Sequence, residues 1–509
     1  MIKSNGGIIG PDNVTTGGAF GTASGVFKLN EVTDLIKESK WPTAGPEGFQ
    51  VANSLRFNDG SSDYLTRTNS GTGSTSKSTI SLWTKRSGIS SYQDIWESYN
   101  DGSNYFRFRF RDDNRLDMQS DISNSTVFLK RTTRVFRDTS AWYHICVVID
   151  LTQSNADKIK LYINGTRETA FDSSTDLTST SQQFVGGGGS YNFTIGRHPS
   201  SDAYYDGYMA EYVFVDGQAL APTSFGEENS QTGIWVPKSV TGLTFGTNGF
   251  YQNYSNSGAL GEDFSGNDND FTVNNLTSLD QSTDTCSTNF ATLNPLENFY
   301  SNFTFSEGNL SVVSGANGYF SPILSTIGIP ATSGKWYCEV KFDVASTTVY
   351  SFIGITGSPI TQTNLNIGGR TYGYAYIYNG QKYNNNSGSS YGNGYVEGDI
   401  IGIAVDATNS KIYFSKNGTW QNSGNPESGS TGTGAAFTIS TTPTQGFYFF
   451  GCSDDNNGTG TSAWSWNFGS PPFAISSGNT DANGFGNFEY AVPTGYLSLN
   501  TKNLAAVLA

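Results

Sequence analysis

One strand-like segment carries three arginines at alternate positions. Residues 105–111 alternate aromatic and basic side chains with a strict period of two. Because side chains two apart share a face of a strand, Arg107, Arg109 and Arg111 would form a basic row opposite three phenylalanines. Such a row could contact an acidic neighbouring subunit or an anionic cell-surface glycan. The alternative is cross-strand pairing, which would neutralise the row, with the nearby acids Asp112, Asp113 and Asp117.

A second candidate surface is a run of tyrosines at alternate positions: Tyr372, Tyr374, Tyr376 and Tyr378. Asn and Gly flank the run, and tyrosine rings in such a setting can stack on sugars and hydrogen-bond to their hydroxyl groups. Alternation would bring the four rings to one face of a strand. The same pattern is as typical of a sandwich face packed against the opposite sheet, so both interpretations stay open.

Oxygen ligands suited to calcium gather between residues 263 and 270, at Asp263, Asn267, Asp268 and Asp270. The segment departs from the EF-hand pattern, because Asp268 stands where Gly is needed and Asn274 where a bidentate Glu should be. This departure favours an Asx-rich turn over a metal site. A calcium ion is compatible with these residues but has no further support in the sequence. We expect no other cofactor.

The residues needed for catalysis are scarce. A metal cluster or a Ser-His-Asp triad would have to use His144 or His198, the only two histidines. His144 fits a satisfied core or edge residue, and His198 lies in a loop without an evident partner. Retaining glycosidases place two carboxylates about 5 Å apart, yet no Glu-x-Asp-x-x-Glu strand occurs. We therefore expect a protein that is not an enzyme, with a polysaccharide depolymerase as the weaker alternative.

The composition of the chain excludes some classes of binding partner. The 509 residues carry a formal net charge of −15, which argues against nucleic acid. Charged residues make up only 14% of the chain, whereas Gly (60), Phe (34) and Tyr (28) are abundant, as in turn-rich all-β proteins. The longest apolar run, 400–405, is far too short to span a bilayer, so we expect no membrane insertion. The first ten residues have no signal-peptide core, which predicts synthesis in a cytoplasm.

Residues 1–45 are predicted to form an N-terminal anchor. A Gly-rich opening is followed by a short segment with helical spacing that ends at Trp41-Pro42. So short a helix is not stable alone, and must dock on the chain's own body, another subunit or a larger assembly. The candidate assembly residues are Ile8, Ile9, Val32, Leu35, Ile36 and Trp41.

Residues 46–240 alternate short strands with tight turns, as at 159–163 before Asn164-Gly165, which predicts a β-sandwich. The order of its elements resembles the laminin-G-like, concanavalin A-like jelly roll. The matching stretches are 54–57 with 63–65, 79–85, 142–144, 161–165, 195–196 and 206–211. Residues 241–295, rich in Asn, Ser, Thr and Gly, are predicted to be a connector.

Residues 296–500 are predicted to form a second β-sandwich, followed by a tail at 501–509. A Trp-Tyr-x-Glu-Val strand at 336–340, a Gly-Asp-x-Ile-Gly-x-Ala-x-Asp strand at 398–406 and a closing Trp-x-Phe-Gly at 466–469 appear in order. With the Asn-Gly turn at 417–418, this order resembles the SPRY domain. SPRY domains are recognition modules, so the resemblance implies binding through loops. The expected fold class is all-β, with two sandwich domains in tandem and a short N-terminal helical anchor.

The stretches 5–11 and 24–29 with Trp41-Pro42 resemble the N-terminal tag of structural proteins from marine tailed bacteriophages. The stretches 280–285, 289–295 and 495–500 are similar to connectors in the same group. The resemblance implies a virion protein that is released by lysis. Its expected role is that of a tail fibre or similar adhesin, with other virion proteins and a host-surface glycan as partners and a homo-oligomer as its assembly. The alternative is a purely structural capsid decoration or collar protein.

Overall fold

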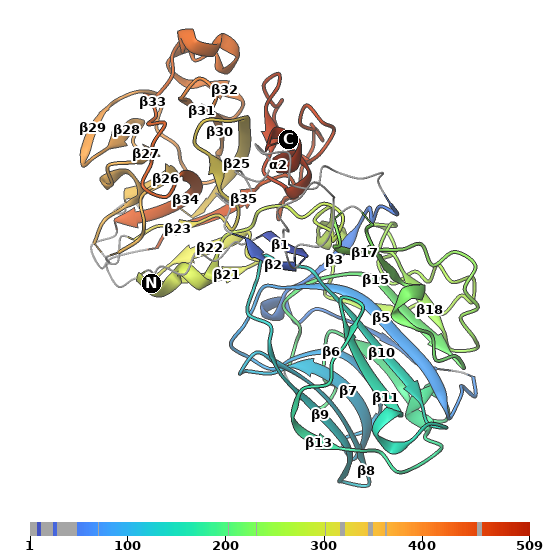
Figure 1. Ribbon diagram of the computed structural model, residues 1–509. Helices are drawn as coiled ribbons and strands as arrows, with labels where there is room; N and C mark the ends of the chain where they lie inside the picture. Colours follow the sequence, from blue (N-terminus) through green and yellow to red (C-terminus); the bar gives the residue numbers. More distant parts are fainter. Residues whose placement is uncertain are drawn as a thin grey trace. The chain divides into compact units, whose positions relative to one another are not determined.

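The computed structural model describes residues 8–11, 24–27, 48–69, 71–201, 203–230, 232–300, 302–315, 321–344, 350–361, 364–455 and 461–508. The chain divides into two units, an N-terminal unit with Ala44–Ser287 as its main part and a C-terminal unit with Thr288–Ala509 (Figure 1). Strands make up most of the regular secondary structure of both units, which confirms the expected all-β fold.

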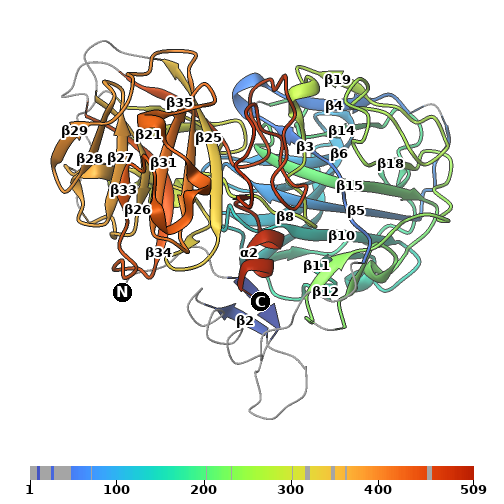
Figure 2. The same cartoon turned by 90° about the horizontal axis from the view of Figure 1, so that it is seen from above.

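The N-terminal unit is a sandwich of two antiparallel sheets. The first, which we call the β5 sheet, runs in the order β12 (Thr166–Arg167), β11 (Ile159–Ile163), β10 (Tyr143–Asp150), β5 (Lys77–Arg86), β15 (Gly207–Asp216), β3 (Ser54–Phe57) and β20 (Gln281–Ser282), with β18 (Phe250–Gln252) on β15. Figure 2 shows β15, β5, β10 and β11 side by side in this layer.

The opposite layer, the β7 sheet, runs in the order β13 (Phe171–Thr175), β9 (Ser125–Val135), β8 (Arg115–Ile122), β7 (Asn104–Phe110), β6 (Gln93–Asp101), β14 (Asn192–Ile195), β4 (Tyr64–Arg67) and β19 (Thr272–Asn274). A separate two-stranded sheet joins β16 (Gly226–Glu228) to β17 (Trp235–Pro237).

Aromatic rings fill the space between the two layers of the N-terminal unit. Trp96 on β6 lies 4.5 Å from Phe193 and 5.5 Å from Phe214, measured between ring centroids. Phe250 joins the same cluster from β18. Large aromatic side chains let a chain with few aliphatic residues bury enough apolar surface to fold.

The expected connector at 241–295 differs from the structure. Strands β18, β19 and β20 all lie in it, and they pair with β15, β4 and β3 of the sandwich. Asp284, in the same segment, forms a buried ion pair with Lys85 of β5. Each of these strands has only two or three residues, too few for a period-two signal. The segment up to Ser287 therefore belongs to the N-terminal unit.

A buried acid in this unit predicts a pH-dependent stability. Burial raises the pKa of Glu211 to about 7, although Tyr251 Oη donates to its carboxylate at 2.6 Å. The nearby Tyr251, Tyr254 and Cys286 have a raised pKa and stay neutral below pH 8. Because the folded-state pKa exceeds the unfolded one, the stability from Glu211 is complete below about pH 4.5 and is lost as the pH rises through 7.

Glu211→Gln stays neutral at every pH. As the pH rises from 4 to 8, we expect its free energy of unfolding to increase relative to that of the native chain by on the order of 3 kcal/mol. Urea unfolding at each pH measures this difference. The exposed Glu228→Gln serves as the control and should follow the native pH profile. A constant difference between Glu211→Gln and the native chain across this range would contradict the prediction.

The C-terminal unit is also a sandwich, and its larger layer is the β25 sheet. Its order is β21 (Phe303–Ser306), β22 (Ser311–Ser314), β35 (Ala463–Asn467), β25 (Lys335–Val344), β30 (Ile400–Asp406), β31 (Lys411–Lys416) and β32 (Thr419–Trp420). The strands β33 (Phe437–Thr438) and β36 (Leu497–Ser498) pair with β31 and β25.

The facing layer is the β26 sheet: β23 (Ile323–Leu324), β34 (Phe447–Asp455), β26 (Tyr350–Thr356), β27 (Gly373–Ile377), β28 (Gln381–Asn384) and β29 (Ser387–Ser390), with β24 (Ile329–Pro330) on β34. Figure 1 shows β26 to β29 in sequence in this layer. Trp336, Trp464 and Trp466 are buried between the layers. The expected tail is instead the helix α2 (Thr501–Leu508), whose Leu504 joins this core.

Part of the expected anchor is described. Strands β1 (Ile8–Pro11) and β2 (Ser24–Phe27) form a two-stranded sheet, so Ile8 and Ile9 lie in a strand. The expected helix, with Val32, Leu35, Ile36 and Trp41, lies outside the described residues. Within the part of the chain that the structure describes, no helix is long and apolar enough to cross a bilayer.

Candidate functional site

The predicted arginine row lies on the outer face of the β7 sheet. Phe106, Phe108 and Phe110 of β7 are buried in the core. The alternating Arg107 and Arg109 therefore face away from the core. Arg111 follows directly after the strand. The predicted alternation is thus present, and the partners on this face decide what it can bind.

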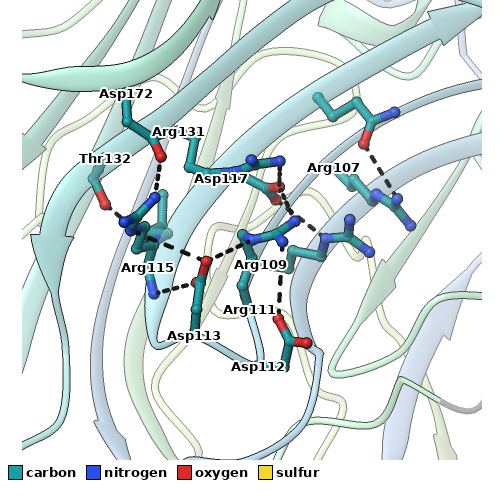
Figure 3. Close-up of polar contacts among 12 residues, drawn as sticks. Arg107, Arg109, Arg111, Asp112, Asp113, Arg115, Asp117, Arg131, Thr132 and Asp172 are labelled. Carbon is teal, nitrogen blue, oxygen red and sulfur yellow. Dashed lines mark hydrogen bonds and ion pairs between the residues drawn. The ribbon is translucent and has the colours of Figure 1, made fainter.

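Acidic side chains neutralise most of the row. Arg109 Nε lies 3.1 Å from Asp117 Oδ1, and Arg111 approaches Asp117, Asp113 and Asp112 at 3.4, 3.4 and 3.8 Å (Figure 3). Arg131 of β9 adds a third cation at 3.5 Å from Asp117, whose side chain is buried. Asp112, Asp113 and Asp117, which the sequence offered as cross-strand partners of the row, therefore pair with Arg109 and Arg111. The row is a paired network and not an open basic patch.

Arg107 has a different environment. Its Nη2 donates to Gln119 Oε1 at 3.3 Å, and its guanidinium lies 5.0 Å from the centroid of the Tyr105 ring. Its Nε is buried and has no hydrogen-bond partner within the described ranges. Arg107 is only 8% exposed, so it offers little surface to a large anionic ligand.

Next to the arginines, the structure brings together two carboxylates and a histidine that the sequence did not link. Asp94 and Glu97 lie on β6, opposite Arg109 and Arg107 in the register of β7. His198, in the loop after β14, places Nδ1 2.8 Å from Glu97 Oε2. One ligand atom from each of Asp94, Glu97 and His198 lies within 4.8 Å of the other two.

A bulge in β6 explains why the sequence did not show this cluster. In a regular strand, residues three apart point to opposite faces. The register between β6 and β7 shifts between Asp94 and Trp96, so Ile95 is skipped in the pairing with β7. The extra residue turns Asp94 and Glu97 to the same outer face, while Trp96 keeps its place in the core. His198 is 101 residues from Glu97 and had no partner in the sequence analysis.

The three side chains of the cluster are buried, and their pKa values differ from the ordinary ones. Burial raises the pKa of Asp94 to about 7, partly offset by Arg107, and raises the pKa of Glu97 well above its ordinary value. Burial, followed by the charge of Arg107, lowers the pKa of His198 to about 4. Asp94 and Glu97 are 0% exposed and His198 is 8% exposed. A polysaccharide therefore has no access to either carboxylate in this structure.

The second histidine is part of the core, as the sequence predicted. His144 is fully buried; Trp235 Nε1 donates to its Nδ1 at 3.0 Å, and its Nε2 lies 2.9 Å from Ser81 Oγ. Burial lowers its pKa to about 3. Both ring nitrogens are thus occupied, which makes His144 a structural residue.

Comparison with known families matches one model to each unit. Residues 59–223 match the model described as the Concanavalin A-like lectin/glucanases superfamily. Residues 335–468 match the SPRY domain. The chain carries one domain of each kind. These matches agree with the two resemblances seen in the sequence, and we call the domains the concanavalin A-like domain and the SPRY domain.

Solved structures resemble single parts of the chain. A candidate carbohydrate binding protein from Bacteroides ovatus is 13% identical over 44% of this chain and 59% of its own length, with a TM-score of 0.28. A heptameric SAP-like pentraxin from Limulus polyphemus is 14% identical over 34% of this chain and 80% of its own, with a TM-score of 0.25. The SPRY domain of human HERC1 is 16% identical over 34% of this chain and 96% of its own, with a TM-score of 0.26.

In the SPRY domain, the tyrosine run faces the core instead of presenting a sugar-binding surface. Tyr374 and Tyr376 belong to β27 and lie in the main core, and Tyr372 and Tyr378 pack against it while partly buried. Tyr374 Oη accepts a hydrogen bond from Ser440 N at 3.1 Å. Rings enclosed between two sheets cannot stack on a glycan, so the packing alternative describes Tyr374 and Tyr376.

The predicted calcium ligands form a hydrogen-bonded turn. Asp263 Oδ1 accepts from Tyr251 N and Ser265 N, and Oδ2 accepts from Ser265 Oγ and Asn269 N, all at 2.7–2.9 Å. Asp270 Oδ1 accepts from Asp263 N at 2.8 Å.

The other two members of the predicted calcium set are exposed. Asn267 Nδ2 donates to two backbone carbonyls, and Asp268 is exposed with a positive φ of 56°. The geometry is that of an Asx-rich turn, in which the oxygens of Asp263 already serve as acceptors.

Proposed function

We propose that the chain is a non-catalytic binding protein of a phage virion, which docks on the particle through its N-terminal segment and contacts a host-surface glycan or neighbouring virion proteins through its two domains. The concanavalin A-like superfamily includes both lectins and glucanases, so the family match alone does not choose between binding and catalysis. The observation that carries the proposal is the burial of Asp94 and Glu97, which keeps these carboxylates from a chain substrate.

The virion assignment is supported by the sequence segments that resemble phage structural proteins, at the N-terminus, around residues 280–295 and at 495–500. Two binding-type domains in tandem suit an adhesin, because a second site on the same chain raises the effective concentration of a multivalent ligand. A homo-oligomer would multiply the number of sites further.

Electron microscopy of virions labelled with Fab fragments against the SPRY domain tests this proposal. We expect label at the tail or fibre tips. Label over the capsid or collar would favour a structural decoration protein, and purified virions that lack the chain would contradict the virion assignment. Deletion of residues 1–45 should abolish incorporation into particles, and undiminished incorporation would contradict the anchor.

One observation keeps the depolymerase as a second candidate. The carboxylates of Asp94 and Glu97 approach within 4.8 Å, near the ~5 Å of retaining glycosidases. We expect no reducing sugar to be released when the full chain is incubated with host polysaccharide. Release that disappears in Glu97→Gln, but not in the exposed Glu228→Gln, would establish an enzyme and overturn the binding proposal.

A further inference from the structure

We propose that Asp94, Glu97 and His198 of the concanavalin A-like domain bind one divalent transition-metal ion, Zn²⁺ or Mn²⁺. The inference goes beyond the proposed function and does not depend on it. Two carboxylates and an imidazole are a ligand set that both ions accept, since carboxylates suit Mn²⁺ and imidazole suits Zn²⁺. Three protein ligands leave room for one or more water ligands.

The three ligand atoms already converge. They lie within 4.8 Å of one another, and Glu97 and His198 are in contact at 2.8 Å. Metal–ligand bonds of about 2.0–2.2 Å place ligand atoms on opposite sides of an ion some 3–4 Å apart. The side chains would thus need only small adjustments to surround an ion.

Asp94 supplies an independent observation. Both of its carboxylate oxygens are buried, and neither has a hydrogen-bond partner among the residues that the structure describes. An isolated buried carboxylate is costly, because burial removes its water and nothing replaces it. Among the described residues, Asp94 also has no cation within 4.0 Å, although Arg109 lies opposite it in the sheet. A bound cation would satisfy both oxygens.

The neighbouring positive charges are largely committed to other partners. Arg109 pairs with Asp117 at 3.1 Å, and Arg107 donates to Gln119 at 3.3 Å. Arg197, which precedes His198, stacks on Tyr64 and Tyr204. The positive charge of these three arginines weakens the attraction of the site for a cation. Both carboxylates must therefore be ionised when the ion binds, so that a ligand set of charge −2 faces the 2+ ion.

Binding would exchange protons for metal without any redox step. Nδ1 of His198 now shares a hydrogen bond with the Glu97 carboxyl group. An imidazole nitrogen ligates only through its lone pair, so ligation through Nδ1 requires the ring proton to be on Nε2, and any proton on Asp94 or Glu97 leaves to solvent. The ion would then connect β6 to the loop between β14 and β15.

Metal quantification on the full chain tests the site. Protein dialysed against EDTA is loaded with ZnCl₂ or MnCl₂ in separate samples, desalted and measured by inductively coupled plasma mass spectrometry. We expect one ion per chain in at least one sample and a higher Tm in its presence. Asp94→Asn and His198→Gln should each weaken binding by more than about 100-fold, since even outer-shell changes cost roughly 10–100-fold.

Glu228→Gln, which removes an exposed acid from the same domain, should bind as the native chain does. In EDTA, Asp94→Asn should melt no lower than the native chain, because it removes a buried carboxylate that has no hydrogen-bond partner in the described part of the chain. A native chain that retains neither ion, or variants that retain as much as the native chain, would overturn the proposal. The first result would leave an ordered water as the occupant beside Asp94.

Discussion

Lys85→Met is expected to lower the free energy of unfolding of the N-terminal unit by about 3–5 kcal/mol. Lys85 Nζ lies 2.5 Å from Asp284 Oδ2, and both side chains are almost completely buried. Trp142 Nε1 also donates to Asp284, at 3.3 Å. Removing the ammonium group leaves a buried carboxylate without its opposite charge, which costs far more than the pair itself contributes. Urea unfolding followed by tryptophan fluorescence measures the change.

Two further variants make this test specific. Lys77, on the same strand, pairs with Asp150 at 3.5 Å, but its side chain is 41% exposed. Lys77→Met should therefore cost less than about 1 kcal/mol. The double variant Lys85→Met/Asp284→Leu should recover most of the loss, because it removes both buried charges. A cost for Lys85→Met no larger than that for Lys77→Met would show that the segment around Asp284 is not packed against β5.

Tyr376→Ala is expected to destabilise the C-terminal unit by about 3–5 kcal/mol. The ring is fully buried and lies 5.3 Å from the Phe414 ring and 5.5 Å from the Tyr395 ring, measured between centroids. Its hydroxyl also donates to the Asn393 carbonyl. Truncation leaves a cavity between the sheets and an unpaired carbonyl, and thermal or urea unfolding measures the sum of both effects.

Tyr372 provides the matched control, since it belongs to the same run but only packs against the edge of the core. Tyr372→Ala should cost clearly less than Tyr376→Ala. The two interpretations of the tyrosine run differ in this respect. A sugar-binding Tyr376 would lose ligand affinity and leave the unfolding midpoint unchanged, and that result would contradict the core position.

Paired charges on the β7 sheet bear on where the proposed ligand would bind. Asp117 lies within 3.5 Å of Arg109, Arg111 and Arg131, so these cations gain little from a further anion. An anionic glycan would have to displace partially buried ion pairs and desolvate both partners. This physical cost favours recognition through loops over recognition through the arginine row.

Long strands with clear alternation were predictable from the sequence. The phenylalanines of β7 and the isoleucines and leucine of β11 are buried as their period of two requires. In the C-terminal unit, β30 and β31 begin and end close to the positions that the turn residues indicated. The short strands β18, β19 and β20 were assigned to a connector because two or three residues are too few to carry a periodic signal.

The candidate site was only half predictable. Alternation placed Arg107 and Arg109 on one face, and the nearby aspartates were recognised as alternative partners. Asp94 and Glu97 were not linked, because a regular strand would point them to opposite faces. The two interpretations of the tyrosine run could not be separated either, since a face packed on a sheet and a face open to solvent share one pattern.

The sequence by itself determined the class of fold, the order of its two sandwich domains and the alternation of the long strands, because these depend on the types of neighbouring residues. The tertiary structure alone decided which polar groups meet. The bulge at Ile95 turns Asp94 to the face of Glu97, and the loop after β14 brings His198 to Glu97 from 101 residues away. Contacts of this kind depend on sheet register and loop path, and no local pattern encodes them.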